Sequence, residues 1–432
     1  MASVGHQVDD ASGSPGADEL PQAGTGLWRG PLRALRHRDF RLFLFGQVIS
    51  LSGTWMQSLA VSWLIYRLTH SAAMMGLVGF IGQIPVLVLG PIAGLAADRH
   101  PRRRIILCTQ ALLMLQSAIL AALALSGSIK FVHIAALSLL SGLVNAFDIP
   151  ARQSLYIRLV GKDDLLSAIS LNSVTFNSAR IVGPSIAGFL VAALGEGPCF
   201  LINSVSFLPV LASILVMRAA EPVRRPAESA LANLRDGLRY AWSSHDIRGF
   251  LGLTAAANLA CAPALVLAPV IADAVFHQGS QGLGLLTGAF GVGAVIGTLT
   301  LAARDRPSHL RTIFFSALQL ALALALYAWS PAFAVSLCAA GLIGYAVMRQ
   351  LAATNTEIQS RIDDAFRGRV MAMYSMVVVG MLPIGNLLGG AIAEIIGVRW
   401  TIFTGALLCL AAVLLWRRSL PPGRFHRSKE NE

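Results

Sequence analysis

Long apolar stretches alternate with short polar segments along almost the whole chain. Twelve stretches can be distinguished, near 41–66, 72–97, 105–126, 131–148, 165–194, 199–217, 250–275, 282–303, 311–329, 332–350, 370–396 and 400–416. Most reach the roughly 20 residues that a helix needs to cross a bilayer. Because backbone polar groups must be satisfied inside a bilayer, such stretches predict helices rather than loops. The pattern predicts an all-α membrane protein with twelve transmembrane helices.

Charged residues at the edges of these stretches recur in the second half of the chain. Asp98-Arg99 reappears as Asp305-Arg306, 207 residues later. The same offset maps Asp39 onto Asp246, Arg41 onto Arg248 and Arg104 onto Arg311, and an offset of 202 maps residues 183–195 onto 385–397. Parallel repeats of this size are a common plan among transporters. The sequence therefore predicts two pseudo-repeated six-helix bundles, at 38–217 and 249–418, with a cavity between them at the middle of the membrane.

The remaining segments are polar and predict tails and a linker. Residues 1–37 contain no apolar core of a signal peptide, so we expect a disordered cytoplasmic tail there and a second tail at 419–432. Residues 218–248 join the halves, and one helical face there carries Leu231, Leu234, Leu238 and Trp242. This amphipathic pattern fits a helix on the inner membrane surface and fits a soluble linker helix equally well.

The distribution of positive charge predicts the orientation. The chain has a net charge of +12 and contains 34 Lys and Arg residues. Only Arg67, Lys130 and Arg399 fall in the expected outer loops, and only Arg180 falls within a span. By the positive-inside rule, both termini are expected in the cytoplasm. The cations therefore serve topology, and no nucleic-acid partner is expected.

Composition limits the chemistry further. Only 13% of the residues are charged, against about a quarter in soluble domains. No Gly-Lys-Ser/Thr nucleotide loop is present. The cysteines are widely spaced and no pair has metal-ligand spacing: Cys108, Cys199, Cys261, Cys338 and Cys409. We therefore expect no enzyme, no cofactor and no metal site.

The segment between the second and third stretches resembles a known signature. Gly94-x-x-x-Asp98-Arg99-x-x-Arg102-Arg103 resembles the loop 2–3 signature of the major facilitator superfamily, with Pro101 where the signature has Gly. Other stretches are similar to its transmembrane secretion effector branch, which includes the bacterial enterobactin exporter: 40–43, 149–153, 177–184, 199–203 and 366–370. The resemblance spans all twelve stretches and implies the major facilitator fold. It does not identify a cargo, because one fold hosts many functions.

The same resemblance implies a latch on the cytoplasmic side. An Asp at a helix end can hold nearby Arg side chains or lie against the positive N-terminus of another helix. In the superfamily, that partner is the start of the eleventh span. The latch residues implied here are Gly94, Asp98, Arg99, Arg102 and Arg103, with Gly368 and Arg369 opposite them. The alternative is that these charges only fix topology in solvated loops.

A second segment resembles the antiporter signature that the superfamily carries in its fifth span, chiefly in exporters. It reads Gly183-Pro184-x-x-Ala187-Gly188, with Ala187 where Gly is usual. Small residues allow close helix approach, and Pro184 frees a backbone carbonyl. The resemblance implies a role in export, and ordinary tight packing would require the same residues.

Arg180 is the charge expected deepest in the membrane. A guanidinium inside a span costs about 2.5–3.5 kcal/mol on insertion scales. It should therefore face the protein interior, where it could bind an anion or balance a protonatable group. The alternative is that its side chain snorkels to the membrane surface.

Proton coupling requires a titratable group that meets each side of the membrane in turn. The acidic candidates lie near the ends of the expected spans rather than in the middle: Asp39, Asp148, Asp273, Glu357 and Glu394. The Arg-containing signature that many proton antiporters carry in span 4 is absent from residues 138–145. Protons as the coupling ion are thus implied by the family resemblance alone.

Polar residues on otherwise apolar spans are the candidates for lining the cavity. They are Gln47, Thr54, Gln57, Gln83, Asn177, Asn203, Asn258 and Asn386. Each could instead form a helix–helix hydrogen bond, worth about 0.6 kcal/mol. We expect a monomeric secondary transporter that exports a small amphiphilic molecule, a siderophore or a drug-like compound, by alternating access and proton antiport. An importer of a small organic solute and a non-transporting membrane sensor or assembly protein remain alternatives.

Overall fold

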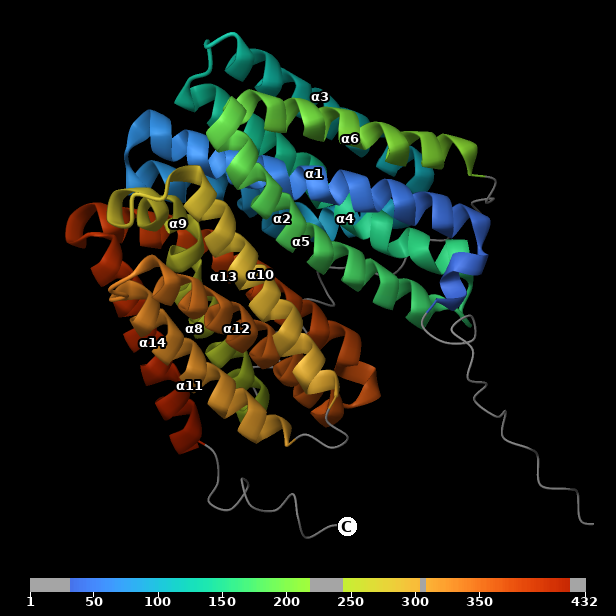
Figure 1. Ribbon diagram of the computed structural model, residues 1–432. Helices are drawn as coiled ribbons and strands as arrows, with labels where there is room; N and C mark the ends of the chain where they lie inside the picture. The colour runs from blue at the N-terminus through green and yellow to red at the C-terminus, as the bar shows by residue number, and fades with distance from the viewer. Residues whose placement is uncertain (1–31, 218–243, 304–307, 420–432) are drawn as a thin grey trace, which may run out of the picture.

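The computed structural model describes residues 32–217, 244–303 and 308–419, and every regular element within them is a helix (Figure 1). The first half contains η2 (Arg33–Arg36), α1 (Arg38–Thr69), α2 (Ala72–Arg99), α3 (Arg102–Leu125), α4 (Phe131–Val160), α5 (Leu165–Leu194) and α6 (Glu196–Val216). The second contains α8 (His245–Val266), α9 (Ala268–Val270), η3 (Ile271–Val275), α10 (Gly279–Ala302), α11 (His309–Ala328), α12 (Phe333–Arg361), α13 (Asp364–Ile396) and α14 (Val398–Ser419). The amphipathic face expected in the linker, most of the expected tails and Asp305-Arg306 lie outside the described residues.

Twelve of these helices are long and apolar enough to cross a membrane, which confirms the predicted number. In the most apolar window of each, only 28% to 56% of the residues are buried inside the protein. The others expose large apolar side chains, such as Phe45, Val132 and Leu166. Apolar surface on this scale requires a lipid environment.

The helices form the two predicted six-helix bundles. In the first bundle, α1 packs on α5 and α6, and α2 packs on α4. In the second, α10 and α11 pack on α12, and α13 packs on α8. Two long contacts join the bundles, one between α2 and α13 and the other between α5 and α10. The helices therefore adopt the two-bundle arrangement that the half-chain repeat predicted.

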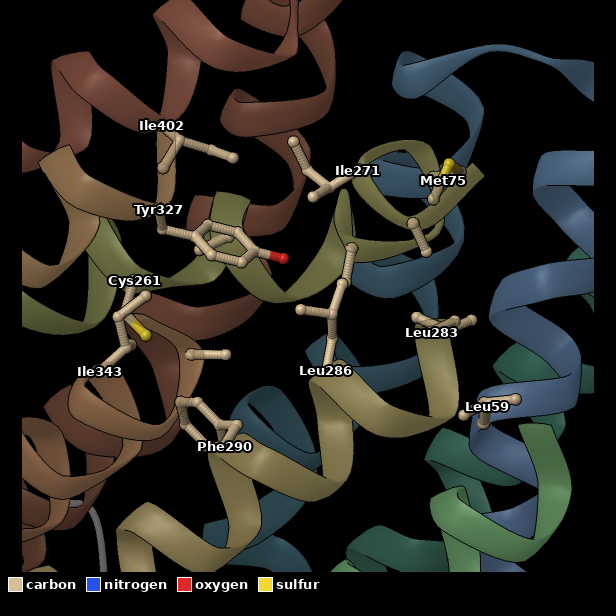
Figure 2. Packing of buried hydrophobic residues seen from close by; sticks show 14 of the residues in the cluster. Leu59, Met75, Cys261, Ile271, Leu283, Leu286, Phe290, Tyr327, Ile343 and Ile402 are labelled. Atoms are coloured by element: carbon tan, nitrogen blue, oxygen red, sulfur yellow. The ribbon is translucent and has the colours of Figure 1, made fainter. Parts of the chain in front are cut away.

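The two ends of the molecule differ in how the bundles meet. We call the end where α1 begins and α14 finishes the basic side, and the other end the distal side. At the distal side, one apolar cluster runs across both bundles and includes Leu59 and Met75 of the first and Leu286 and Ile402 of the second (Figure 2). Toward the basic side, each bundle has a separate apolar cluster of its own. The bundles are thus joined at the distal side, and their ribbons diverge toward the basic side (Figure 1).

The folded unit begins earlier than residue 38. The η2 segment packs on the loop between α4 and α5, where the buried carboxylate of Asp164 pairs with Arg33 at 3.0 Å, Arg36 at 2.7 Å and His37 at 2.8 Å. The hydrogen bond from His37, together with the charges of Arg36 and Arg33, holds the pKa of Asp164 below its ordinary value. The tail expected over 1–37 therefore ends earlier than predicted, because residues 33–37 belong to the folded unit. Hydropathy does not detect a segment that docks through charged side chains.

Candidate functional site

Arg180 lies near the middle of α5, where the two bundles meet. Its residue surface is 8% exposed. Its Nη2 donates a hydrogen bond to Oδ1 of Asn177 at 3.1 Å, and its Cζ lies 5.8 Å from the ring centroid of Phe290 on α10 of the other bundle. The Nε atom is buried without a hydrogen-bond partner, and within the described residues no carboxylate pairs with this guanidinium. Arg180 thus faces the opposite bundle, which is not the position of a side chain that snorkels to the surface.

Aromatic rings extend this surface along the first bundle. Trp55 of α1 and Phe176 of α5 meet edge to face, with ring centroids 5.6 Å apart. Phe176 is 42% exposed and lies one helical turn before Arg180. Gly183 permits this approach of α1 to α5, because a Cβ added to it would lie 2.7 Å from the Cβ of Trp55. We call Trp55, Phe176, Arg180 and Phe290 the Arg180 group.

The segment that resembles the antiporter signature forms the contact between α5 and α10 at the distal side. A Cβ added to Gly188 would lie 2.7 Å from the carbonyl oxygen of Ser280 and 2.9 Å from Cα of Gly284. A Cβ on Gly284 would lie 2.8 Å from the carbonyl oxygen of Pro184. The hydroxyl of Ser280 donates to the carbonyl of Gly188 at 3.0 Å. These small residues therefore bring the backbones of opposite bundles together.

The contact between α2 and α13 is the repeat copy of that crossing. A Cβ on Gly76 or on Gly390 would lie 2.9 Å from the Cα of the other. Gly76 and Gly284 are related by an offset of 208, and Gly188 and Gly390 by 202. Asn386, one of the cavity candidates, is buried in this crossing, and its backbone carbonyl faces Gly76. Two glycine crossings of the same kind, α5 with α10 and α2 with α13, therefore join the bundles on the distal side.

Two carboxylates add polar contacts between the bundles on the distal side. The hydroxyl of Tyr66 donates to Oδ2 of Asp273 at 2.8 Å. Oε2 of Glu394, near the end of α13, accepts from the hydroxyl of Ser71 and from the backbone N–H of Ala73, both at 3.1 Å. Ser71 is the N-cap of α2, so Glu394 lies against the positive end of that helix.

The basic side lacks such close packing around the latch glycines. A Cβ added to Gly94 or to Gly368 would meet nothing within 4 Å. Arg103 donates to the carbonyls of Leu215 and Met217 at the end of α6, in its own bundle. Arg99 is exposed and Arg102 is buried, while the guanidinium of Arg369 lies over Phe366 of its own helix at 5.7 Å. The side chain of Asp98 lies outside the described residues, so the latch stays a prediction.

Most cavity candidates already form hydrogen bonds within one bundle. Oε1 of Gln57 accepts from Ser117 at 2.6 Å and from Asn203 at 2.8 Å. Nδ2 of Asn258 donates to the carbonyl of Thr254 in its own helix. Of the others, Thr54 and Gln83 are exposed, and Asn177 is half-buried beside Arg180. The Arg180 group therefore joins one predicted polar residue, Arg180, to three aromatic side chains where the two bundles meet.

One buried charge pair is not evident from hydropathy. Asp148 is fully buried in α4 and pairs with Arg152, one turn later. Its Oδ1 accepts from Thr109 at 2.7 Å and from Gln110 at 2.9 Å, and Nη1 of Arg152 donates to Oε1 of Gln47 at 2.7 Å. The expected span ended at residue 148, whereas α4 continues to Val160. Arg152 is therefore a second arginine inside the helices, besides Arg180. The spacing of one helical turn between Asp148 and Arg152 was the sequence signal that could have revealed this pair.

The sequence matches a known family along nearly its whole length. Residues 29–430 match the family described as transmembrane secretion effectors. The chain belongs to this family. It is a multi-pass membrane transporter of the major facilitator type and not an enzyme.

Three relatives of this transmembrane secretion effector cover most of it. The multidrug efflux pump Tap of Mycolicibacterium fortuitum is 27% identical over 87% of this chain and 92% of the pump. The staphyloferrin A transporter of Staphylococcus aureus is 25% identical over 86% of this chain and 94% of that transporter. The enterobactin exporter EntS of Shigella flexneri is 27% identical over 88% of this chain and 91% of the exporter.

Solved structures share the fold at lower identity. A bacterial homologue of the iron transporter ferroportin, in its inward-facing state, is 17% identical and aligns with a TM-score of 0.70 over 88% of this chain and 98% of that chain. The outward-facing state of that homologue aligns over 88% of this chain and 99% of that chain, with 18% identity and a TM-score of 0.58. The likeness concerns the fold alone.

Proposed function

We propose that this protein exports a small amphiphilic molecule, a siderophore or a drug-like compound, across the bacterial inner membrane by alternating access and proton antiport. The observation that carries the proposal is the Arg180 group, which lies near the middle of α5 and faces α10 of the other bundle, between two bundles that close only on the distal side. The names of the three relatives support this cargo class and, for two of them, the outward direction.

The basic side faces the cytoplasm in this proposal. The loop from α2 to α3 places Arg99, Arg102, Arg103 and Arg104 at that side, and positive loops remain inside during membrane insertion. Both termini are then cytoplasmic, and the conformation described here is open inward. The higher TM-score against the inward-facing ferroportin homologue agrees with this assignment.

The cargo is held by the Arg180 group. Its guanidinium has an unused Nε donor, and charge-assisted hydrogen bonds to carboxylate or catecholate oxygens are among the stronger ones. Trp55 and Phe176 offer apolar faces beside it. An anionic or oxygen-rich molecule with an aromatic or apolar body matches this combination.

The latch closes the cytoplasmic side in the opposite conformation. α2 and α13 run antiparallel, so Asp98, in the last turn of α2, can reach the N-terminus of α13 when the bundles close there. Opening inward separates the two helix ends. Asp98→Asn is therefore expected to lower transport without lowering membrane insertion, measured as cargo flux against the amount of folded protein. Wild-type flux from a normally inserted variant would refute the latch.

The test is whole-cell accumulation in a bacterium that lacks its major efflux pumps. Wild type is compared with Arg180→Ala and Arg180→Lys, using dyes, antibiotics and a catecholate siderophore, with and without a protonophore. We expect reduced accumulation of at least one compound, loss of this effect with the protonophore and with Arg180→Ala, and partial retention with Arg180→Lys, which keeps the charge but not the planar donors. Size-exclusion profiles of the variants control for folding.

Two results would overturn the proposal. Proton-driven movement of the same compound out of inside-out vesicles, rather than into them, would indicate an importer. An absence of flux for every compound, with folded protein in the membrane, would favour a non-transporting sensor or assembly protein.

A further inference from the structure

Each bundle contains a buried polar node at the same place in the repeat. In the first bundle the node joins Gln47 of α1, Thr109 of α3 and Asp148 of α4. Offsets of 207, 207 and 206 map these residues onto Thr254 of α8, Ser316 of α11 and Thr354 of α12. All six residues are at most 6% exposed. The repeat has therefore kept three polar positions in both halves.

The two nodes differ in charge. The first holds the ion pair of Asp148 and Arg152, with further hydrogen bonds from Thr109 and Gln110 to the carboxylate. The second is neutral at the three equivalent positions, and the hydroxyls of Thr254, Ser316 and Thr354 have no hydrogen-bond partner within the described residues. The second bundle has its ion pair further along α12, between Glu357 and Arg361, and therefore does not need one at this position.

A charge pair that the fold does not need calls for another explanation. Removing two charges from water costs free energy that their mutual attraction does not always recover. Ionisable groups inside a membrane protein are accordingly rare and mark pathways for ions or protons. The asymmetry between otherwise equivalent nodes points to a function for Asp148 rather than to packing.

We propose that Asp148 is the proton-coupling carboxylate of this transporter and that Arg152 is its switchable partner. A proton from water adds to a carboxylate oxygen of Asp148, and the ion pair becomes a neutral acid beside a free guanidinium. Release of the proton restores the pair. The proposal rests on the proton antiport given under Proposed function.

The surroundings leave Arg152 as the charge that faces Asp148. On α4, the other titratable neighbour is Tyr156, whose hydroxyl donates to Asn172 of α5 at 2.6 Å. The charged residues of α1 and α3 nearest to the node are at the basic-side starts of those helices, at 38–41 and 102–104. Residues 72–97 of α2 contain no charge, and the one charged residue of α5 is Arg180, which faces α10. Arg152 is therefore the charged partner of Asp148.

Exposure agrees with proton release to the basic side. The side chain of Arg152 is 17% exposed and that of Asp148 is fully buried. The ion-paired form seen here is the state that an antiporter reaches after releasing its proton inward. Protonation of Asp148 weakens its ion pair with Arg152, and Arg152 in turn donates a hydrogen bond to Gln47 of α1. Helix α1 packs on α5 beside the Arg180 group, so the change can reach that group.

The test needs no cargo. Exposed Cys108 and Cys338 are replaced by Ser, the buried cysteines remain, and spin labels are placed at Ser128 and Ala332, exposed positions on the distal side of opposite bundles. Distances are measured in nanodiscs at about pH 5.5 and about pH 8.5 for wild type, Asp148→Asn and Thr354→Val. We expect the ratio of distal-open to distal-closed molecules to change at least about tenfold with pH in wild type and in Thr354→Val, and less than about twofold in Asp148→Asn.

Three outcomes would overturn the proposal: a wild type without pH response, an Asp148→Asn variant with the wild-type response, or equal loss of response in Thr354→Val. The double variant Asp148→Asn with Arg152→Gln removes both charges, so it tests the same point if Asp148→Asn alone does not fold. A pH response that depends on Asp148, combined with no export of any compound, would refute the proposed function and leave Asp148 as the group that links protonation to the conformation of the bundles.

Discussion

Loss of one oxygen atom at Tyr66 should open the distal side. Tyr66→Phe keeps the ring and removes the hydroxyl that donates to Asp273 across the bundles at 2.8 Å. The two residues are 207 positions apart, which is the repeat offset, so they occupy equivalent places in the two halves. Equivalent residues that touch lie close to the pseudo-two-fold axis, and this contact therefore has no second copy to compensate for its loss.

The expected magnitude follows from the contact itself. A hydrogen bond to a charged acceptor contributes about 1.5–3 kcal/mol. Tyr66 is 7% exposed, but Asp273 is only half-buried, so water can replace part of the lost bond. We therefore take the lower value, about 1.5 kcal/mol, which corresponds to a roughly tenfold shift of the equilibrium toward the distal-open state.

The assay is the distance distribution between spin labels at Ser128 and Ala332 in nanodiscs at constant pH. Tyr374→Phe is the matched control, because its hydroxyl donates to the carbonyl of Leu351 at 2.8 Å within a single bundle. A population ratio unchanged by Tyr66→Phe, or an equal shift in Tyr374→Phe, would refute the assignment of this contact to distal closure.

Three further substitutions test the same architecture. Glu394→Gln removes an exposed charge that lies against the N-terminus of α2, an interaction worth about 0.3–1 kcal/mol, so the distal-open population should rise by about two- to fivefold. High salt should reduce this difference from wild type. A shift that does not depend on salt would contradict the charge–dipole account. Gly188→Ala places a Cβ 2.7 Å from a backbone oxygen of α10 and should favour the distal-open state in the same label assay, whereas Gly252→Ala, where a Cβ meets nothing within 4 Å, should not. The carboxylate of Asp164 has a lowered pKa, so it stabilises the docked η2 segment above about pH 4, and this stabilisation is lost as pH falls through the folded-state pKa. The protection factors of the amides of residues 33–37, which compare their exchange with the intrinsic rate at the same pH, should therefore be high at neutral pH in wild type and fall as pH drops through the folded-state pKa. Asp164→Asn should remove the protection at neutral pH. Persistent protection in the variant would show that other contacts hold η2.

The number and arrangement of the helices could be predicted because burial in lipid imposes a long apolar stretch on each. Helix ends could not, since charged residues continue a helix beyond the apolar core: α4 runs to Val160 and α12 to Arg361. This error concealed the ion pair of Asp148, because a hydropathy boundary at residue 148 placed Arg152 in a loop. The boundary was wrong for a physical reason, namely that paired charges can remain inside a bundle.

The candidate site was predicted in part. The position of Arg180 in the middle of a span could be foreseen from length alone, and the close packing of Gly183 and Gly188 from their small size. The partners of Gln57 and Asn203 could not, because a polar stripe does not specify which neighbouring helix it faces. Glu394 was visible only as an acid near a helix end, and its contact lies on a segment 321 residues away in the sequence.

The positions of the acidic residues connect the two sides of the membrane through one pair of helices. α2 and α13 are antiparallel neighbours. Each carries a carboxylate near its own C-terminus, where the helix dipole disfavours a negative charge. The same carboxylate lies on the side of the N-terminus of the other helix, whose dipole favours a negative charge. Glu394 makes that contact on the distal side in the conformation described here. In the proposed latch, Asp98 makes the equivalent contact on the basic side after the distal contact has been released. Under the proposed alternating access, rigid bundles that tilt about the middle of the membrane cannot close at both ends. The two carboxylates of the proposal then compete, and the free energy of one contact sets the population of the other.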